Sequence, residues 1–136
     1  MKLLLDTHAL LWWLSDDPKL GAAARDRIMD PANDILVSVV SLWEILVKVR
    51  AGKLEAGIEE ILDEMQAQGF TLLQIAPAHL VALAALPMHH RDPFDHLLIA
   101  QAIAEKATFV SEDGYTPRYP VPWLPCSGTL SGLAPP

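Results

Sequence analysis

The sequence has a single cysteine, Cys126, among its 136 residues. One cysteine cannot form an intramolecular disulfide, and so low a content is typical of proteins in a reducing compartment. No apolar run approaches the roughly 20 residues that a membrane-spanning helix needs. Asp6 interrupts the leucine-rich start of the chain, which argues against a signal peptide. We therefore expect a cytoplasmic protein with no membrane-spanning segment.

Positive charge is also scarce, because 10 lysines and arginines stand against 17 acidic residues and leave a net charge of −7. Proteins that bind nucleic acids usually present a basic surface, so the charge argues against such a partner. That objection weakens if some carboxylates bind divalent cations, which reverse the local sign of the charge. An acidic surface also favours a basic protein partner.

The length and the 51% content of hydrophobic residues predict one domain with a substantial core. We expect this single domain to occupy residues 1–124. Proline, glycine and serine are frequent near the end of the chain, so residues 125–136 are expected to form a flexible C-terminal tail.

Short apolar runs alternate along the chain with segments of helical periodicity. The runs predict strands at 2–5, 35–38, 70–75 and 107–111, with a possible short edge strand at 121–124. The other segments predict helices over 8–14, 19–29, 41–50, 57–68 and 77–86, and one that begins at Pro93 after an Asp92 cap. This alternation predicts a three-layer α/β/α fold around a mostly parallel sheet of four or five strands.

The apolar side chains suggest two details of packing. In the helix predicted over 77–86, the core side is expected to carry Leu80, Val81, Leu83 and Ala84. Trp12 and Trp13 are adjacent in another predicted helix, so we expect that they do not both pack on one core. One of them would then belong to a contact surface.

Acidic residues recur where predicted strands end or predicted helices begin. Asp6 ends the first strand and Asp113 follows the fourth. Glu44, Asp92 and Asp95 are expected on the first turns of helices. Right-handed crossovers place the carboxyl ends of parallel strands at one edge of a sheet, so these five acids are expected to meet there.

Each acid also has a purely structural explanation. Asp6 and Asp92 can cap helices, and the spacing of Ser41 and Glu44 is that of a capping box. The Asp-Gly pair at 113–114 is typical of a turn. The convergence of all five is harder to explain in this way, because clustered carboxylates repel one another and are costly to desolvate.

A hard divalent cation would neutralise such a cluster. Oxygen ligands without cysteine favour Mg²⁺ or Mn²⁺ over zinc. His8 is a lone histidine beside an acid, and His89 and His90 are neighbours in a loop that should point in different directions. We expect all three to be structural or to support the metal ligands.

Three strings of residues resemble the PIN-domain nucleases, and most closely the VapC-like toxins of bacterial type II toxin–antitoxin pairs. The strings are Leu5-Asp6-Thr7-His8, Ser41-Leu42-Trp43-Glu44-Ile45 with Lys48 to Leu54, and His90-Arg91-Asp92-Pro93-Phe94-Asp95 with Leu98 to Ala102. The resemblance covers about residues 1–124, and the third string is its most specific part. His96 stands where the family more often has arginine.

The resemblance implies a role for each acid. Asp6 corresponds to the family's first acid, Glu44 to its helix-borne glutamate and Asp95 to the acid of its third motif. Asp92 is the additional acid of the Asp-Pro-Phe-Asp variant, and Asp113 stands where the family has its fourth carboxylate. These residues would be both the catalytic residues and the ligands of Mg²⁺ or Mn²⁺.

The resemblance further implies an endoribonuclease that cleaves RNA, is often a homodimer and is inhibited by a small antitoxin with a basic arm. A PIN-like fold that binds RNA or protein without catalysis is the alternative. Two other classes place acids at strand ends, but each lacks a residue here. A haloacid-dehalogenase-type enzyme needs a second aspartate where His8 stands, and a receiver-like module needs a lysine after the strand that ends near Val110.

Overall fold

A computed structural model describes residues 1–127 of the chain. Most of the tail predicted over 125–136 lies outside these residues. The five strands of the described part are β1 (Lys2–Leu5), β2 (Asp34–Ser38), β3 (Thr71–Leu73), β4 (Thr108–Val110) and β5 (Trp123–Leu124). They form one sheet in the order β3-β2-β1-β4-β5, and every neighbouring pair is parallel.

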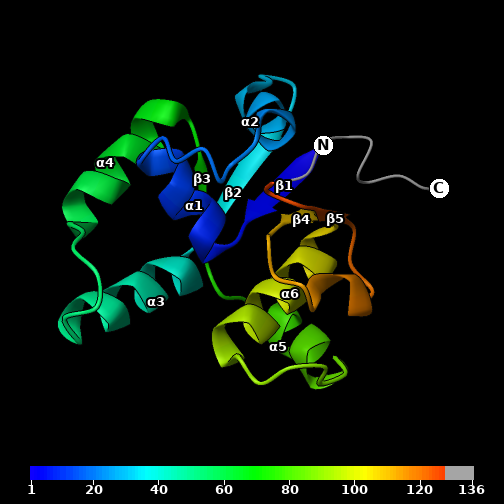
Figure 1. Ribbon diagram of the computed structural model, residues 1–136. Coiled ribbons are helices and arrows are strands. Elements are labelled where there is room, and N and C mark those ends of the chain that lie inside the picture. Colours follow the sequence, from blue (N-terminus) through cyan, green and yellow to red (C-terminus); the bar gives the residue numbers. More distant parts are fainter. Residues whose placement is uncertain (128–136) are drawn as a thin grey trace.

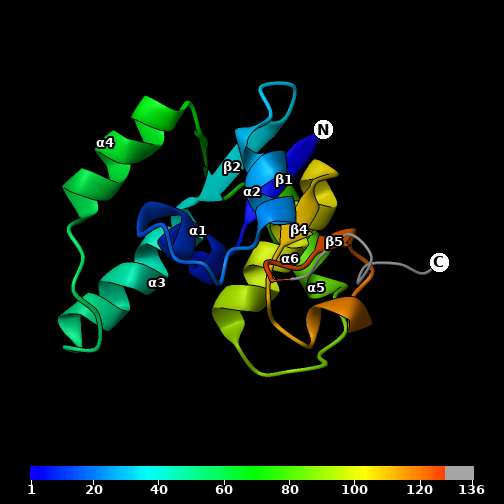
Figure 2. The ribbon, with the colours of Figure 1, turned by 45° about the horizontal axis from the view of Figure 1, so that its top comes forward.

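Six α-helices connect the strands of the described part: α1 (Thr7–Leu14), α2 (Ala22–Met29), α3 (Val39–Arg50), α4 (Ile58–Gln68), α5 (Pro77–Ala84) and α6 (Pro93–Glu105). Helices lie on both faces of the sheet, with α1, α2 and α4 on one side and α5 and α6 on the other (Figures 1 and 2). The predicted α/β architecture is confirmed, and the sheet is entirely parallel. None of the helices within residues 1–127 is long and apolar enough to cross a membrane.

The central strand β1 is apolar on both faces because each face is covered. Leu3 and Leu5 pack in a core with side chains of α1, α2, α3 and α4. Leu4 points the other way and packs with Leu98 and Ile99 of α6. A strand buried on both sides has no polar alternation, which is why the continuous run at the start of the chain predicts it correctly.

The expectation about the two tryptophans is wrong. Trp12 and Trp13 are both partly buried and both pack against the core that contains Leu3 and Leu5. Trp12 stacks on His8 with 5.7 Å between ring centroids, and Trp13 tilts against Phe70 at 5.8 Å. Each indole lies at the margin of the core, where a large ring can contact apolar side chains with part of its surface and solvent with the rest.

The expected core side of α5 is also wrong, because three of its four residues are exposed and the fourth, Leu83, is only partly buried. Leu80 is 52% exposed and Val81 is 71% exposed, whereas the polar His79 is 1% exposed. The imidazole of His79 lies 2.8 Å from a carboxylate oxygen of Glu105 and accepts a hydrogen bond from the backbone N–H of Ala76 at 2.9 Å. The contact with Glu105 joins the polar side of α5 to α6, and the side that carries Leu80 and Val81 faces outward.

Candidate active site

All five predicted acids line one pocket at the carboxyl ends of β1 and β4. The pocket has a volume of about 340 Å³, and its other lining residues are Thr7, His8, Trp12 and Glu112. Asp6 follows β1 directly and Asp113 follows β4, while Glu44 belongs to α3 and Asp92 and Asp95 to the start of α6. The parallel sheet brings together acids that are more than 100 residues apart in the sequence.

Asp6 combines a helix cap with a buried position. Its side chain accepts a hydrogen bond from the backbone N–H of Ala9 at 2.7 Å, which makes it the N-cap of α1. It is 4% exposed. Burial raises the pKa of Asp6 to about 6, against the lowering effect of the Ala9 hydrogen bond.

Glu44 is not part of a capping box, so that structural explanation is wrong. The chain turns directly from β2 into α3, and the Ser38 hydroxyl caps the helix by accepting the N–H of Val40 at 3.0 Å. Ser41 lies inside the helix rather than at its start. Because Ser38 is already the cap, Glu44 lies in the second turn and has no capping role.

The carboxylate of Glu44 is buried and held from both sides. Its Oε1 accepts a hydrogen bond from the Thr7 hydroxyl at 2.6 Å, and its Oε2 lies 3.4 Å from Nζ of Lys48. Thr7 also contacts the Ser41 hydroxyl at 3.1 Å. These contacts fix the Glu44 side chain against the wall of the pocket.

Asp92 is the N-cap of α6, as predicted. Its Oδ1 accepts the backbone N–H of Phe94 at 2.9 Å and that of Asp95 at 3.3 Å, and Pro93 occupies the first helical position. A cap and a metal ligand use different lone pairs of a carboxylate, so this hydrogen bonding leaves Oδ2 available.

Asp95 has the most perturbed carboxyl group of the pocket. Its pKa is raised to about 9, mainly by burial, with smaller contributions from a hydrogen bond with Asp113 and from the negative charges of Asp92 and Asp6. Asp95 therefore retains its proton at neutral pH unless a cation neutralises the pocket.

Asp113 is held by the turn that follows β4. Its Oδ1 accepts the backbone N–H of Tyr115 at 2.9 Å, and its own N–H donates to the Ser111 hydroxyl at 3.0 Å. The turn predicted from the Asp-Gly pair is therefore present, and it presents the second carboxylate oxygen of Asp113 to Asp95 and His90.

The two loop histidines differ in their surroundings. His89 is exposed, whereas the side chain of His90 is only 7% exposed and its Nε2 lies 3.4 Å from Oδ2 of Asp95. Burial lowers the pKa of His90. Nothing in the local sequence separates two neighbouring histidines, and the signal that does is a contact of His90 with Tyr119, 29 residues later.

The donor set fits a hard divalent cation. The pocket offers carboxylate oxygens from several elements, and burial together with the neighbouring negative charges raises the pKa values of Asp6 and Asp95, a cost that a bound cation would offset. Carboxylates and water are the ligands preferred by Mg²⁺ and Mn²⁺. The structure thus brings the predicted residues together, while their function as metal ligands remains a prediction.

Comparison with known proteins assigns the family. Residues 3–121 match the PIN domain family. The chain is 28% identical over 113 residues to ribonuclease VapC22 of Mycobacterium tuberculosis, an alignment that covers 81% of this chain and 85% of that protein.

Solved structures with this fold include VapBC2 from Rickettsia felis bound to a DNA fragment from its promoter, with a TM-score of 0.73, 19% identity and coverage of 92% of this chain and 98% of that chain. DNA-bound VapBC from Salmonella typhimurium has a TM-score of 0.67, 14% identity and the same two coverages. VapBC-1 from nontypeable Haemophilus influenzae has a TM-score of 0.67 and 13% identity, and covers 94% of this chain and 100% of that chain. The match over most of the sequence, together with the parallel sheet and its acidic pocket, shows that this chain belongs to the PIN domain family.

Proposed function

We propose that this protein is a Mg²⁺- or Mn²⁺-dependent endoribonuclease of the cytoplasm and the toxin of a toxin–antitoxin pair. The observation that carries the proposal is the convergence of six acidic residues, the five predicted ones and Glu112, from four separate segments on one pocket whose lining contains no lysine or arginine. This count refers to the described residues 1–127. Among these residues, the side chain of Lys48 forms an ion pair only with the Oε2 of Glu44. Membership of the PIN family and the similarity to a protein named a ribonuclease support the choice of RNA as substrate.

Asp6 and Asp95 would hold the principal cation, with Asp92 and Asp113 assisting directly or through water. When bound, a divalent cation polarises the scissile phosphate and lowers the pKa of a water molecule. The four aspartates would hold and orient this cation, whose positive charge would offset the repulsion between the acidic pocket and a phosphodiester.

Glu44 is the residue best placed to orient the attacking water and accept its proton. Thr7 and Lys48 hold its carboxylate in one orientation. In the proposed hydrolysis, the water oxygen forms a bond to phosphorus and the bond from phosphorus to the 3′ oxygen breaks. The 3′ oxygen takes up a proton, so the products carry a 3′-hydroxyl and a 5′-phosphate.

The direct test is to incubate the purified protein with total RNA in Mn²⁺, in Mg²⁺ and in EDTA. We expect cleavage within the chains in the presence of either cation and no cleavage in EDTA. Sequencing of the cleaved RNA should show 5′-phosphate ends and would also identify the preferred target. Cleavage that continues unchanged in EDTA would contradict the metal-dependent mechanism, and RNA binding without cleavage would favour the non-catalytic alternative.

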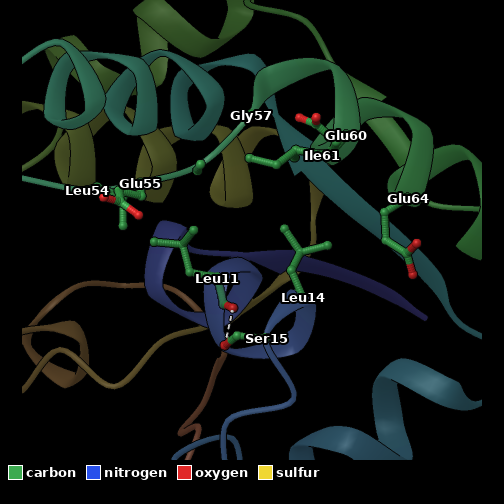
Figure 3. A pocket seen from close by; sticks show the side chains of 10 residues that line it. Leu11, Leu14, Ser15, Leu54, Glu55, Gly57, Glu60, Ile61 and Glu64 are labelled. Atoms are coloured by element: carbon green, nitrogen blue, oxygen red, sulfur yellow. Dashed lines mark hydrogen bonds between the residues drawn. The ribbon is translucent and has the colours of Figure 1, made fainter.

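A groove on another face supports the proposed antitoxin partner. It has a volume of about 540 Å³ and lies between α1 and the segment from Leu54 to Glu64. Leu11 and Leu14 of α1 point across it toward Ile61 of α4 (Figure 3). The rim carries acidic side chains, namely Glu55, Glu60 and Glu64.

An apolar floor with an acidic rim is complementary to an amphipathic segment flanked by lysine or arginine. The resemblance to VapC-like toxins implies a small basic antitoxin, and three similar solved structures are VapBC assemblies. We therefore propose that the antitoxin occupies this groove and that its basic arm reaches the acidic pocket.

Reversal of the rim charge should weaken this complex. In the double variant Glu60→Lys and Glu64→Lys, we expect the affinity for the proposed antitoxin, sought among the products of neighbouring genes, to fall at least tenfold at low salt, and its salt dependence to diminish. Titration calorimetry at two salt concentrations measures both. Glu59→Lys is the matched control, because Glu59 is exposed in the same helix but does not line the groove. Equal losses in the control and the double variant would contradict this placement.

We also propose that the protein is a homodimer. Exposed apolar side chains on α3 and α5 support it, since Trp43 is 57% exposed and Val81 is 71% exposed. Apolar surface of this kind commonly marks an interface. The sedimentation profile of the antitoxin-free protein used in the titrations reports its mass directly, and a monomer at high concentration would contradict the dimer.

A further inference from the structure

The buried Nε2 atom of His90 has an unusual position beside the acidic pocket. Within residues 1–127, it is the one buried side-chain nitrogen or oxygen that has no hydrogen-bond partner. An unpaired buried polar atom costs free energy, so its persistence requires an explanation.

Tyr119 determines which nitrogen of His90 carries the proton. The Tyr119 hydroxyl oxygen accepts the backbone N–H of His89 at 2.9 Å and that of His90 at 3.2 Å. These two bonds use both of its lone pairs, so the hydroxyl can only donate to Nδ1 of His90, which lies 2.7 Å away. Nδ1 is then the acceptor, and the proton of the neutral imidazole is on Nε2.

The ring of His90 cannot turn this N–H elsewhere. It stacks on Tyr115 with an interplanar angle of 10° and 5.1 Å between centroids, and its edge meets His96 at 4.7 Å. The imidazole of His96 also contacts the His90 carbonyl at 2.6 Å, which fixes the backbone. The ring and its backbone are therefore both held by packing.

The fixed N–H faces two carboxylates of the pocket. Nε2 lies 3.4 Å from Oδ2 of Asp95 and 3.8 Å from Oδ2 of Asp113. The other oxygen of Asp113 already accepts the N–H of Tyr115. A small movement of either aspartate would complete a hydrogen bond from His90 and would fix the orientation of that carboxylate.

The same three side chains are also close enough together to be considered as a metal site. Coordination by Nε2 would require the proton to move to Nδ1, which would then donate to a hydroxyl oxygen that already accepts two hydrogen bonds. The hydrogen bonding around Tyr119 therefore favours a donor at Nε2 over a metal ligand.

We propose that His90 is a positioning residue, whose Nε2–H donates to the paired carboxylates of Asp95 and Asp113 and holds them for cation binding, with Tyr119 setting its tautomer. This inference rests on the metal-binding pocket of the proposed function. The exposed His89 cannot take this role, because Nε2 of His90 is the nitrogen that lies beside Asp95 and Asp113.

The tautomer can be observed directly by long-range ¹H–¹⁵N NMR of the histidine rings in the wild-type protein. We expect His90 to be protonated on Nε2, both without metal and with saturating Mg²⁺. A proton on Nδ1, or loss of the Nε2 proton when Mg²⁺ is added, would overturn the proposal and identify His90 as a ligand.

If His90 holds Asp95 and Asp113 for cation binding, its removal should weaken the affinity for Mn²⁺, which electron paramagnetic resonance measures. His90→Phe keeps a flat ring against Tyr115 but has no donor, so Mn²⁺ binding should weaken about 10- to 100-fold, the usual effect of removing a group that orients metal ligands. His90→Gln restores an N–H donor and should recover part of the affinity. His89→Phe is the matched control and should bind Mn²⁺ like the wild type.

The outcomes separate this inference from the proposed function. Wild-type-like Mn²⁺ affinity in a folded His90→Phe variant would overturn the role of His90, whether or not the protein cleaves RNA. Loss of Mn²⁺ affinity in His90→Phe, in a protein whose wild type cleaves no RNA, would support His90 and contradict the ribonuclease. If His90→Phe does not fold, the tautomer in the wild-type protein still decides the question.

Discussion

Replacement of Asp95 by asparagine is expected to abolish RNA cleavage while the fold is retained. Asp95 is central to the pocket, and the negative charges of Asp92, Asp6 and Asp113 all act on it. Removal of its charge should reduce cation binding and lower the cleavage rate by at least about 10²- to 10³-fold, as when other charge-stabilising groups are removed from active sites. The measurement is the rate of RNA cleavage in Mn²⁺ under single-turnover conditions.

Asp6→Asn should have the same effect on the rate for the same reason. Asparagine caps a helix about as well as aspartate, so the hydrogen bond from the Ala9 N–H and the stability of α1 should be preserved. Loss of activity without loss of stability would therefore identify a functional carboxylate rather than a cap.

Asp63→Asn is the control for both variants, because Asp63 is an exposed acid of α4 that does not line the pocket. It should cleave RNA at the wild-type rate. The site assignment would be wrong if Asp6→Asn or Asp95→Asn also cleaved at that rate.

The stability of the metal-free protein should fall as the pH rises. The pKa of Asp95 is about 9 in the folded protein against an ordinary value of 3.8, so the folded state holds a proton that the unfolded chain releases near pH 4. The stabilisation from this proton is complete below the ordinary pKa and is lost as the pH rises toward the folded value. The free energy of unfolding should decrease by up to about 1.4 kcal/mol for each pH unit in this interval.

The effect of Asp95 on the free energy of unfolding should be clearest between about pH 7 and 8.5, because other groups with shifted pKa values contribute little to the pH dependence there. The pKa of Asp6 is raised only to about 6. Burial lowers the pKa of His90 from 6.5, which gives the opposite slope but at lower pH. Burial raises the pKa of the Cys126 thiol, whose ordinary value of 9.0 lies above the window.

Denaturant unfolding at several pH values measures this slope. Asp95→Asn should flatten it, whereas Asp63→Asn should not. Saturating Mn²⁺ should flatten or reverse it, because the cation replaces the proton of Asp95 and binds only the folded state. A wild-type profile that is flat without metal would contradict the shifted pKa of Asp95.

The sequence by itself determined the architecture and five of the six acids that line the pocket, and it missed only Glu112, the neighbour of Asp113. Continuous apolar runs predict buried parallel strands, because a strand covered on both faces needs no polar alternation. The cap at Asp92 and the helix start at Pro93 are equally local, since they depend on backbone groups only two or three residues away. The parallel arrangement then places the acids at one edge of the sheet.

Only the tertiary structure decided which face of α5 is buried, where α3 begins and which polar groups meet. The start of α3 at Val39, rather than at Ser41, depends on how closely the helix follows β2. The outward position of Leu80 depends on a contact of His79 with Glu105, 26 residues away.

His90 is the clearest example of this limit. Its burial, its tautomer and the direction of its N–H depend on Tyr115 and Tyr119, which follow β4 and α6 and are brought back to the loop by the sheet. Hydropathy and capping patterns report interactions within a few residues of the chain. They carry no information about contacts between segments that only folding brings together, and for that reason two identical neighbouring side chains, His89 and His90, acquire different surroundings.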